Sequence, residues 1–340
     1  MINKVHGRFI FILLCIQIKL CYTVKIHTEL NNFHANNPVV SIGVFDGVHR
    51  GHKAIINRLK AKAQEINGES VVVTLWPHPR LVLKKDIDNL HLLNTLEEKK
   101  LLLEKQQIDH LVIIPFNQET SELTALEFIE HILVNKISVR YLLIGYDHHF
   151  GKGGKGDFQD LKKYSRQYNF QVERFEAKTA GDGTRISSTL IRNSLFEGNI
   201  QEANQYLGYN YFMIGRVVGG RHIGKEIGFP TANIEPIETY KMIPRKGVYA
   251  VQITLEGKKL DGMLNIGYRP TISVHGYEKS IEAHIFDFDE NIYNMKIIIH
   301  LLERIRDEKK FDAVDALVNQ LHKDKTRVQK ILSGKTSTDW

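Results

Sequence analysis

The stretch Pro38–Glu65, PVVSIGVFDGVHRGHKAIINRLKAKAQE, decides the fold of the first half of the chain. It opens on a largely apolar run rich in valine and isoleucine, which is typical of a strand buried on both faces of a parallel sheet. Lys53–Glu65 carries apolar residues at helical spacing, and a glycine-rich turn, Gly43–His52, joins the two segments. A buried strand that passes through glycines into a helix predicts an α/β unit with an anion-binding turn.

The alternation of strand-like and helix-like segments continues to about Arg185. Further strands are expected at Val24–His27, Ser70–Leu75, His110–Ile114 and Tyr141–Gly145, and further helices at Thr95–Lys105 and Ala125–Leu133. This order favours a Rossmann-like parallel sheet with helices on both faces.

The pattern of expected secondary structure changes after Tyr209. Short strand-like runs without intervening helices predict an antiparallel β-barrel, and they lie at Met213–Val218, Val248–Leu255, Leu260–Ile266, Glu282–Phe286 and Lys296–Leu302. Phe311–Ile331 is expected to form a C-terminal amphipathic helix. Ser188–Leu207 reads as a helical connector that Gly198 and Gly208 interrupt and end. We therefore expect one domain over residues 23–207 and a second over 208–340.

Composition sets the wider limits. A chain of 340 residues exceeds one ordinary core, and 42% hydrophobic with 25% charged residues excludes wholesale disorder, collagen and coiled coil. The formal net charge of +7 suits polyanionic ligands, without separating nucleic acid from nucleotides. No apolar run is long enough for a polytopic membrane protein. Because Cys15 and Cys21 are the only cysteines, residues 22–340 can form no disulfide, zinc ribbon or thiol nucleophile. We expect a cytoplasmic protein.

The first 22 residues resemble a signal peptide only in part. Lys4 and Arg8 precede the apolar run Phe9–Ile18, as in a signal peptide, but Ile18, Lys19 and Leu20 are not the small residues of a cleavage site. We expect a disordered or mis-called extension, with a targeting segment as the alternative.

Two histidines three residues apart mark the turn after the first strand. Glycines let a phosphate approach the backbone, and the following helix offers free N–H groups at its N-terminus. His49 and His52 would share one side of the first helical turn and could donate hydrogen bonds to a leaving phosphate. Alternatively, the pair could bind a metal, or cap the helix and pack.

This HxGH element resembles the signature of the nucleotidyltransferase superfamily, and Ile186–Arg192, ISSTLIR, resembles that superfamily's ISSTxIR element. The resemblance implies catalytic roles for His49, His52 and Arg192. It implies phosphate or ATP binding by Gly43, Phe45, Asp46, Gly47, Gly51, Ser188 and Thr189. The second element could instead be a helix cap with a surface arginine.

Two further motifs narrow the resemblance. Thr74–Pro79, TLWPHP, and Gly145–Gly151, GYDHHFG, resemble the TFxPHP and GxDFxFG signatures of prokaryotic bifunctional riboflavin kinase/FAD synthetase. In that family these motifs line the adenylyltransferase site, which implies flavin binding by Pro77, His78, Asp147 and Phe150. The chain departs from the family at Trp76, His148 and Gly154.

The second half carries the kinase signatures of the same family. Gly215–Asn233 resembles GxxxGRxxGFPTANI, which implies nucleotide binding by Gly224, Lys225, Gly228 and Asn233, and Mg²⁺ contacts for Thr231 and Asn233. Lys225 replaces the usual arginine. The segments at 265–271, 282–286 and 306–311 resemble the family's later motifs. By resemblance Glu282 is the base that accepts the proton of the ribityl 5′-hydroxyl, and Arg269 and Arg306 bind flavin.

The resemblance therefore implies a nucleotidyltransferase domain followed by a riboflavin kinase barrel. The expected substrates are ATP, riboflavin and FMN, with FMN and FAD as products and Mg²⁺ as cofactor. We expect no nucleic-acid or membrane partner, and a monomer or weak homo-oligomer. One alternative is an adenylyltransferase for another acceptor, and the other is a flavin- or nucleic-acid-binding regulator with inactive sites. The GxGxxG run at Gly151–Gly156 could also indicate binding of a nicotinamide dinucleotide. We rank that function below the one described above, because Asp157 occupies the helix entrance that a pyrophosphate would need.

Overall fold

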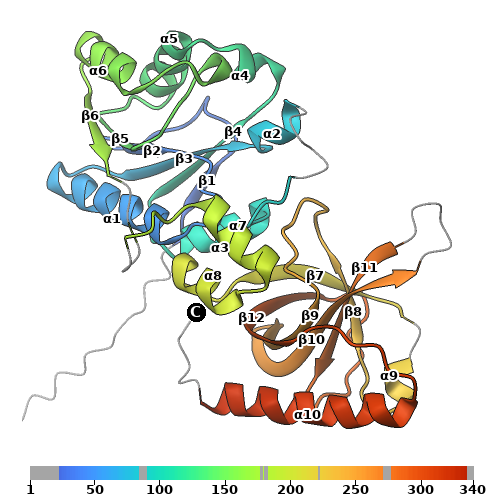
Figure 1. Cartoon of the computed structure of the whole chain (residues 1–340). Helices are drawn as coiled ribbons and strands as arrows, with labels where there is room; N and C mark the ends of the chain where they lie inside the picture. The colour runs from blue at the N-terminus through green and yellow to red at the C-terminus, as the bar shows by residue number, and fades with distance from the viewer. Residues whose placement is uncertain are drawn as a thin grey trace, which may run out of the picture.

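The structure is a computed structural model that describes residues 23–83, 90–176, 179, 183–220, 223–270 and 277–334. The extension predicted for residues 1–22 lies outside these ranges. Figure 1 shows a sheet domain above a barrel domain, with the helices α7 (Ser188–Glu197) and α8 (Ile200–Leu207) between them.

The first domain is built on a six-stranded sheet in which every pair of strands is parallel. Its strands are β1 (Lys25–His27), β2 (Val39–Ile42), β3 (Ser70–Trp76), β4 (His110–Pro115), β5 (Tyr141–Gly145) and β6 (Gln171–Phe175), in the order β1-β4-β3-β2-β5-β6. The strand order reverses between β2 and β5, and sheets of this kind bind ligands where the loops diverge at such a reversal. The parallel sheet predicted from the sequence is confirmed.

Helices cover both faces of this sheet (Figure 1). One face carries α1 (Arg50–Glu65) and α3 (Leu96–Glu104), and the other carries α4 (Gln118–Glu122), α5 (Ala125–Glu127), the π-helix η2 (Phe128–Lys136) and α6 (Phe158–Gln167). Val39 packs into the cluster of the first face and Val40 into that of the second, which is the period of two that a strand imposes. The shorter α2 (Pro79–Val82) and the 3₁₀ turn η3 (Lys152–Gly154) lie in loops. Asp157 caps α6 through Gln159, as expected of a residue at a helix entrance.

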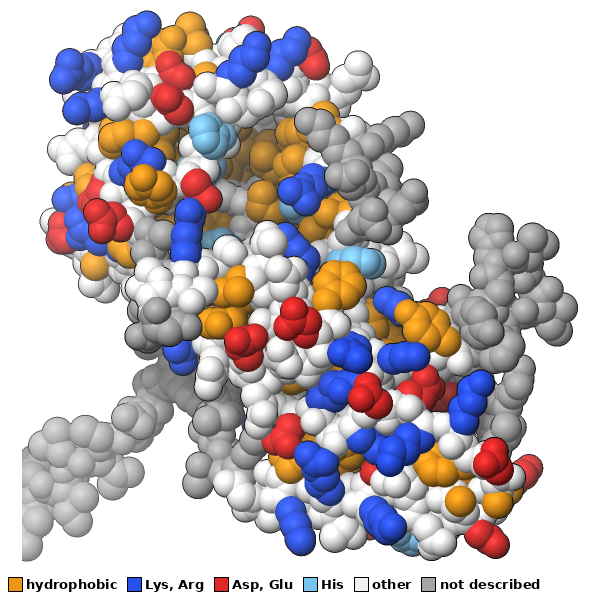
Figure 2. All heavy atoms as spheres, viewed as in Figure 1, with side chains coloured by type: hydrophobic (Ala, Val, Ile, Leu, Met, Phe, Trp, Pro, Cys, Tyr) orange, Lys and Arg blue, Asp and Glu red, His pale blue; other side chains and the backbone are white. Residues whose placement is uncertain are grey.

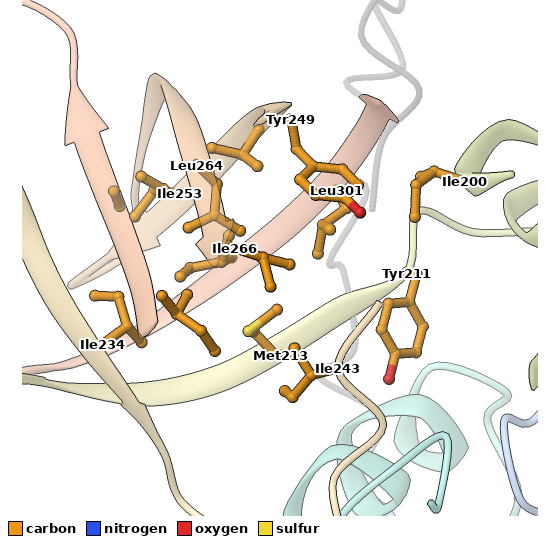
Figure 3. Close-up of a cluster of buried hydrophobic side chains, with 14 of the residues drawn as sticks. Ile200, Tyr211, Met213, Ile234, Ile243, Tyr249, Ile253, Leu264, Ile266 and Leu301 are labelled. Carbon is orange, nitrogen blue, oxygen red and sulfur yellow. The ribbon is translucent and has the colours of Figure 1, made fainter. Parts of the chain in front are cut away.

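The helical connector is confirmed as α7 and α8. Gly198 and Gly208 end these helices with φ values of 85° and 71°, a region that favours glycine. Ile200, Ala203 and Leu207 of α8 belong to the same apolar cluster as the inside of the barrel. Figure 3 shows Ile200 beside Tyr211 and Leu301. The connector is therefore part of a shared core and not a free linker.

The second domain is a closed six-stranded barrel whose strand pairs are all antiparallel, as predicted. Its strands are β7 (Phe212–Val218), β8 (Ala232–Pro236), β9 (Gly247–Leu255), β10 (Lys258–Pro270), β11 (Tyr277–Ile285) and β12 (Lys296–Arg306). Met213, Ile253 and Leu264 point into its core (Figure 3). The short helix α9 (Ile223–Glu226) and the long helix α10 (Val314–Ser333) complete the domain.

A largely buried ion pair, Arg306–Asp324, fastens α10 to the barrel. Arg306, at the end of β12, donates from Nε and Nη2 to the Asp324 carboxylate at 2.7–3.1 Å, and Arg306 Nη1 donates to the Asp307 carbonyl at 2.9 Å. The Asp324 side chain is 4% exposed and the Arg306 side chain 15%, so water contributes little to satisfying either charge. The guanidinium therefore serves to hold α10 against the barrel.

We predict that Asp324→Ala loosens α10 selectively. Removing one partner leaves a largely buried guanidinium unpaired, which costs about 3 kcal/mol. Hydrogen exchange of α10 amides measures the local opening. Asp287→Ala is the control, because the Asp287 side chain is 88% exposed and lies 3.7 Å from Lys325. Equal α10 protection in both variants would contradict this anchoring role.

Candidate functional site

A cavity of about 1230 Å³ opens at the carboxyl ends of the parallel strands. Its walls come chiefly from the loops after β2, β3, β4 and β5 and from the start of α7. Figure 2 shows a hollow in the sheet domain with apolar side chains along its floor. Arg80, Arg185 and Arg192 add positive charge to the lining. Asp46, Glu122, Asp147 and Glu176 also line the cavity, so its wall carries charges of both signs. An apolar floor with arginines on the wall suits a ligand that combines an aromatic ring with phosphates.

The two histidines after β2 lie together on this wall. His49 caps α1: its Nδ1 accepts a hydrogen bond from the His52 backbone N–H at 3.3 Å. The two rings stack with centroids 3.7 Å apart and an interplanar angle of 16°. Gly51 permits this stacking, because a Cβ there would lie only 3.0 Å from the His49 ring. The sequence places these residues side by side, and both line the cavity.

These imidazoles are held neutral. Burial lowers the pKa of His49 to about 4, although Asp46 opposes the shift. Burial also holds the pKa of His52 well below its usual value, and the nearby His49 and Lys99 lower it further. Burial likewise lowers the pKa of His78, across the cavity, to about 4. A neutral imidazole carries one N–H donor and one acceptor, so each ring can donate to a phosphate oxygen.

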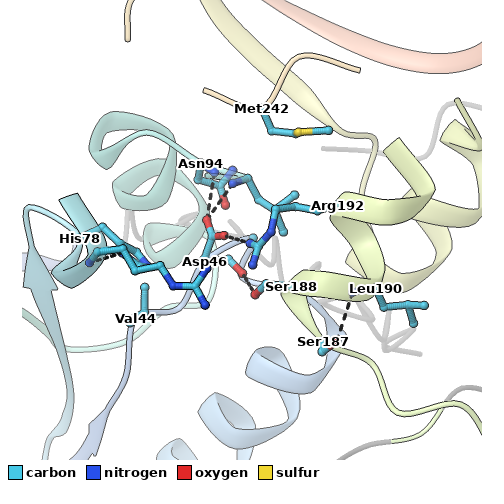
Figure 4. Close-up of polar contacts among 12 residues, drawn as sticks. Val44, Asp46, His78, Asn94, Ser187, Ser188, Leu190, Arg192 and Met242 are labelled. Carbon is cyan, nitrogen blue, oxygen red and sulfur yellow. Dashed lines mark hydrogen bonds and ion pairs between the residues drawn. The ribbon is translucent and has the colours of Figure 1, made fainter. Parts of the chain in front are cut away.

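Asp46 ties three segments together beneath the cavity (Figure 4). Its Oδ1 accepts hydrogen bonds from the Leu93 and Asn94 backbone N–H groups at 2.9 and 3.2 Å. Its Oδ2 accepts one from Arg192 Nη1 at 2.8 Å, and the Asp46 carbonyl accepts one from Ser188 Oγ, also at 2.8 Å. With both carboxylate oxygens occupied, Asp46 orients Arg192.

The start of α7 presents the second predicted motif to the same cavity. Ser187 is the N-cap, and its Oγ accepts a hydrogen bond from the Leu190 N–H at 3.2 Å. Ser188, Thr189 and Arg192 line the cavity. Ser187 therefore caps the helix, while Ser188, Thr189 and Arg192 face the cavity, and their phosphate binding stays a prediction.

The other residues predicted around this cavity divide into two groups. Gly43, Phe45, His78, Asp147 and Phe150 line it, and Asp147 forms an ion pair with Arg185 at 2.7 Å. Gly47 and Pro77 are not among its lining residues. Gly47 faces the domain boundary: its φ is 86°, and a Cβ there would lie 2.6 Å from Leu93.

Lys99 was missed by the sequence reasoning. It is 2% exposed, and its Nζ donates to the Val44 carbonyl at 2.7 Å, directly behind the histidine turn. Burial lowers the pKa of Lys99 to about 8. In the sequence Lys99 is one charge in a charged helix, and only its alignment with the buried residues Leu102 and Leu103 distinguished it.

In the barrel, the three residues predicted for phosphoryl transfer come together. Glu282 on β11 is the register partner of Asn233 on β8. Thr231, two residues before Asn233, places its Oγ1 3.5 Å from Glu282 Oε2. A Cβ at Gly224 would lie 2.4 Å from the Phe229 carbonyl, so glycine is needed where this loop folds back. The three oxygen-bearing side chains form one cluster.

A second cavity, of about 470 Å³, is lined by Gly228–Pro230, which directly precede Thr231 in the chain, and by His284, Phe288 and α10, whereas Thr231, Asn233 and Glu282 are not among its lining residues. Gly228 has a φ of 79°, and His284 Nδ1 lies 2.8 Å from the Pro230 carbonyl. Lys225 is exposed on α9. Arg306 is engaged with Asp324, and the Arg269 side chain lies outside the described part of the chain.

We predict that NMR titration of the ligand-free protein gives a His49 pKa of about 4. Such a group binds fewer protons when folded than when unfolded between pH 6.5 and 4. Its contribution to stability is therefore complete above pH 6.5 and is lost as the pH falls toward 4. A midpoint near the ordinary value of 6.5 would contradict the buried, neutral pair.

Comparison with known proteins shows the family to which each half of the chain is similar. Residues 32–190 match the family model for FAD synthetase, and residues 207–332 match that for riboflavin kinase. A bifunctional riboflavin kinase/FMN adenylyltransferase from Listeria monocytogenes is 39% identical over 288 residues, covering 85% of this chain and 90% of its own. The Escherichia coli protein of the same name is 37% identical, covering 84% and 90%.

A solved structure matches across both domains. A crystal structure titled as a macrolide-efflux protein from Streptococcus pneumoniae has a TM-score of 0.80 and 29% identity, covering 90% of this chain and 99% of that one. Among the residues described here, no helix has the length and apolar character needed to cross a membrane. With both family domains in order and such relatives over most of its length, the chain belongs to the bifunctional riboflavin kinase/FMN adenylyltransferase family.

Proposed function

We propose that the barrel phosphorylates riboflavin to FMN and that the sheet domain then joins FMN to AMP from a second ATP, giving FAD and pyrophosphate. The family assignment supports the two-step conversion. The observation that carries the site assignment is the separation of two reactive clusters, His49–His52–Arg192 in one domain and Thr231–Asn233–Glu282 in the other.

In the barrel, Glu282 accepts the proton of the riboflavin 5′-hydroxyl as that oxygen attacks the γ-phosphorus of ATP. The bond to the β-phosphate oxygen breaks, and ADP leaves. Thr231 and Asn233 bind and orient the phosphates beside this carboxylate, which supports in-line attack. The 470 Å³ cavity lined by Gly228–Pro230 would hold part of the nucleotide or the flavin.

In the sheet domain, a phosphate oxygen of FMN attacks the α-phosphorus of ATP, and the bond to pyrophosphate breaks. His49 and His52 donate hydrogen bonds to the phosphates at the start of α1, where the helix dipole also favours negative charge. Arg192, oriented by Asp46, binds the leaving pyrophosphate. The apolar floor near Phe150 would receive the isoalloxazine ring.

Mg²⁺ is the cofactor proposed for both steps. Thr231 and Asn233 present oxygen ligands, with Glu282 beside them, and a hard cation prefers oxygen donors. When bound, the ion would neutralise part of the phosphate charge. Within the described ranges, no group of three or more His, Cys, Asp or Glu side chains could hold a metal by itself. The cytoplasmic location and the monomeric or weakly oligomeric state remain predictions.

We predict that the two activities can be lost separately. His49→Ala combined with His52→Ala removes the donors to the leaving group and lowers FAD formation about 10²–10³-fold, while FMN accumulates. Glu282→Ala does the converse and leaves added FMN convertible to FAD. Chromatography of riboflavin, FMN and FAD after incubation with Mg-ATP measures all three flavins. Each variant controls for the folding of the other site, and loss of both products in either variant would defeat the scheme.

We also predict that Thr231→Ala weakens the binding of Mg²⁺ in the kinase step alone. Loss of one oxygen near the proposed ion raises the Mg²⁺ concentration for half-maximal FMN formation about 10-fold. Thr231→Ser keeps the hydroxyl and is the matched control. A Mg²⁺ titration of FMN formation, beside one of FAD formation from added FMN, tests this; equal curves for the alanine and serine variants would exclude the role.

A further inference from the structure

We propose that Lys241, which belongs to the barrel, is a positioning residue for adenylyl transfer in the sheet domain, acting through one peptide group on Asp46 and Arg192. This inference rests on the function proposed above. It assigns to the barrel a part in the chemistry of the other domain, in addition to its own phosphoryl transfer.

The Lys241 ammonium group is enclosed at the boundary between the domains. Its side chain is 1% exposed, and the Glu98 side chain that it pairs with is fully buried. Lys241 Nζ donates to Glu98 Oε2 at 2.6 Å and to the carbonyls of Leu93 and Phe212 at 2.7 Å each. Three acceptors satisfy the three N–H donors of the ammonium group, so the position of the Lys241 side chain is fixed. Burial lowers the pKa of Lys241, while Glu98 opposes the shift.

Glu98 belongs to the sheet domain and is also fully satisfied. Its Oε2 accepts a hydrogen bond from the Thr95 N–H at 2.9 Å, which closes the cap of α3. Its Oε1 accepts one from the Ile214 N–H of β7 at 2.9 Å. The ion pair therefore fixes the start of α3 relative to the first strand of the barrel.

Backbone hydrogen bonds extend this contact along the chain. Leu92 N–H donates to the Tyr240 carbonyl at 2.8 Å, and Met242 N–H donates to the Leu92 carbonyl at 2.8 Å. Leu92 and Lys241 thus form a short parallel bridge between the domains. The segment Leu92–Asn94 is held by the barrel on one side.

The same segment holds Asp46 on its other side. The Leu93 carbonyl, which accepts from Lys241, and the Asn94 N–H, which donates to Asp46 Oδ1 at 3.2 Å, belong to one peptide group. A cation at the carbonyl polarises that peptide and strengthens its N–H as a donor. Asp46 Oδ2 binds Arg192, whose guanidinium reaches the cavity. Figure 4 shows Asn94, Asp46 and Arg192 in this order, with Met242 nearby.

The test is Lys241→Met in the full-length chain. Methionine fills similar space without a charge, so the Leu93–Asn94 peptide loses its cation and Arg192 loses its fixed orientation. We expect kcat for FAD formation from added FMN to fall about 10-fold or more, because a small misplacement near the chemistry is enough. The KM for FMN should stay within about twofold, since Lys241 does not line the cavity.

Two internal controls separate positioning from a folding defect and from failure of the proposed function. Riboflavin kinase activity of the same variant should be unchanged, which shows that the barrel around Lys241 is folded. Lys296→Met removes another ion pair between the domains, Lys296–Glu97, at 2.9 Å, but both of its side chains are 45% exposed. This control should leave FAD formation intact. A wild-type chain that forms no FAD would refute the proposed function itself, not the role of Lys241.

The route through Arg192 is tested by a double-mutant cycle. In an Arg192→Ala background, Lys241→Met should change the residual rate of FAD formation by less than about twofold, because its effect is already lost. Additive losses would overturn the proposed route. An unchanged kcat in the single variant, or parallel loss of kinase and adenylyltransferase activity, would overturn the positioning role.

Discussion

A buried carboxylate cannot be left without partners, and that constraint on Asp46 organises the larger site. Asp46 is 6% exposed, and its charge is stabilised by two backbone N–H groups and one guanidinium. Those donors come from two segments, Leu93–Asn94, which the barrel holds, and α7. Satisfying one side chain thus fixes the histidine turn, the arginine and the domain boundary together.

The two active sites use different parts of their folds. In the sheet domain the reversal of strand order brings loops together, and the proposed phosphate site consists of a glycine-containing turn and a helix N-terminus. In the barrel the cluster is set by strand register, since Glu282 and Asn233 are direct partners on β11 and β8. The intact residues in both clusters favour a two-step enzyme over a regulator with inactive sites.

Local patterns predicted much of the fold and site. Apolar runs marked the buried strands, and the spacing of His49 and His52 placed both on one helical turn. The edge strand β6 and the short strand β8 were not predicted, because their half-exposed segments show no clear alternation of apolar and polar residues. The partners of Lys99, Lys241 and Arg306 could not be predicted, because each depends on packing between segments distant in sequence. The surroundings of Gly47 could not be predicted for the same reason, since this residue packs at the domain boundary and does not line the cavity.

The central claim is that one chain carries two separate nucleotide sites. Calorimetric titration with a non-hydrolysable ATP analogue and Mg²⁺ counts them directly. The account predicts two bound analogues per chain, of which one is lost when the imidazoles of the sheet domain are removed. A single bound analogue per chain at saturation would contradict it.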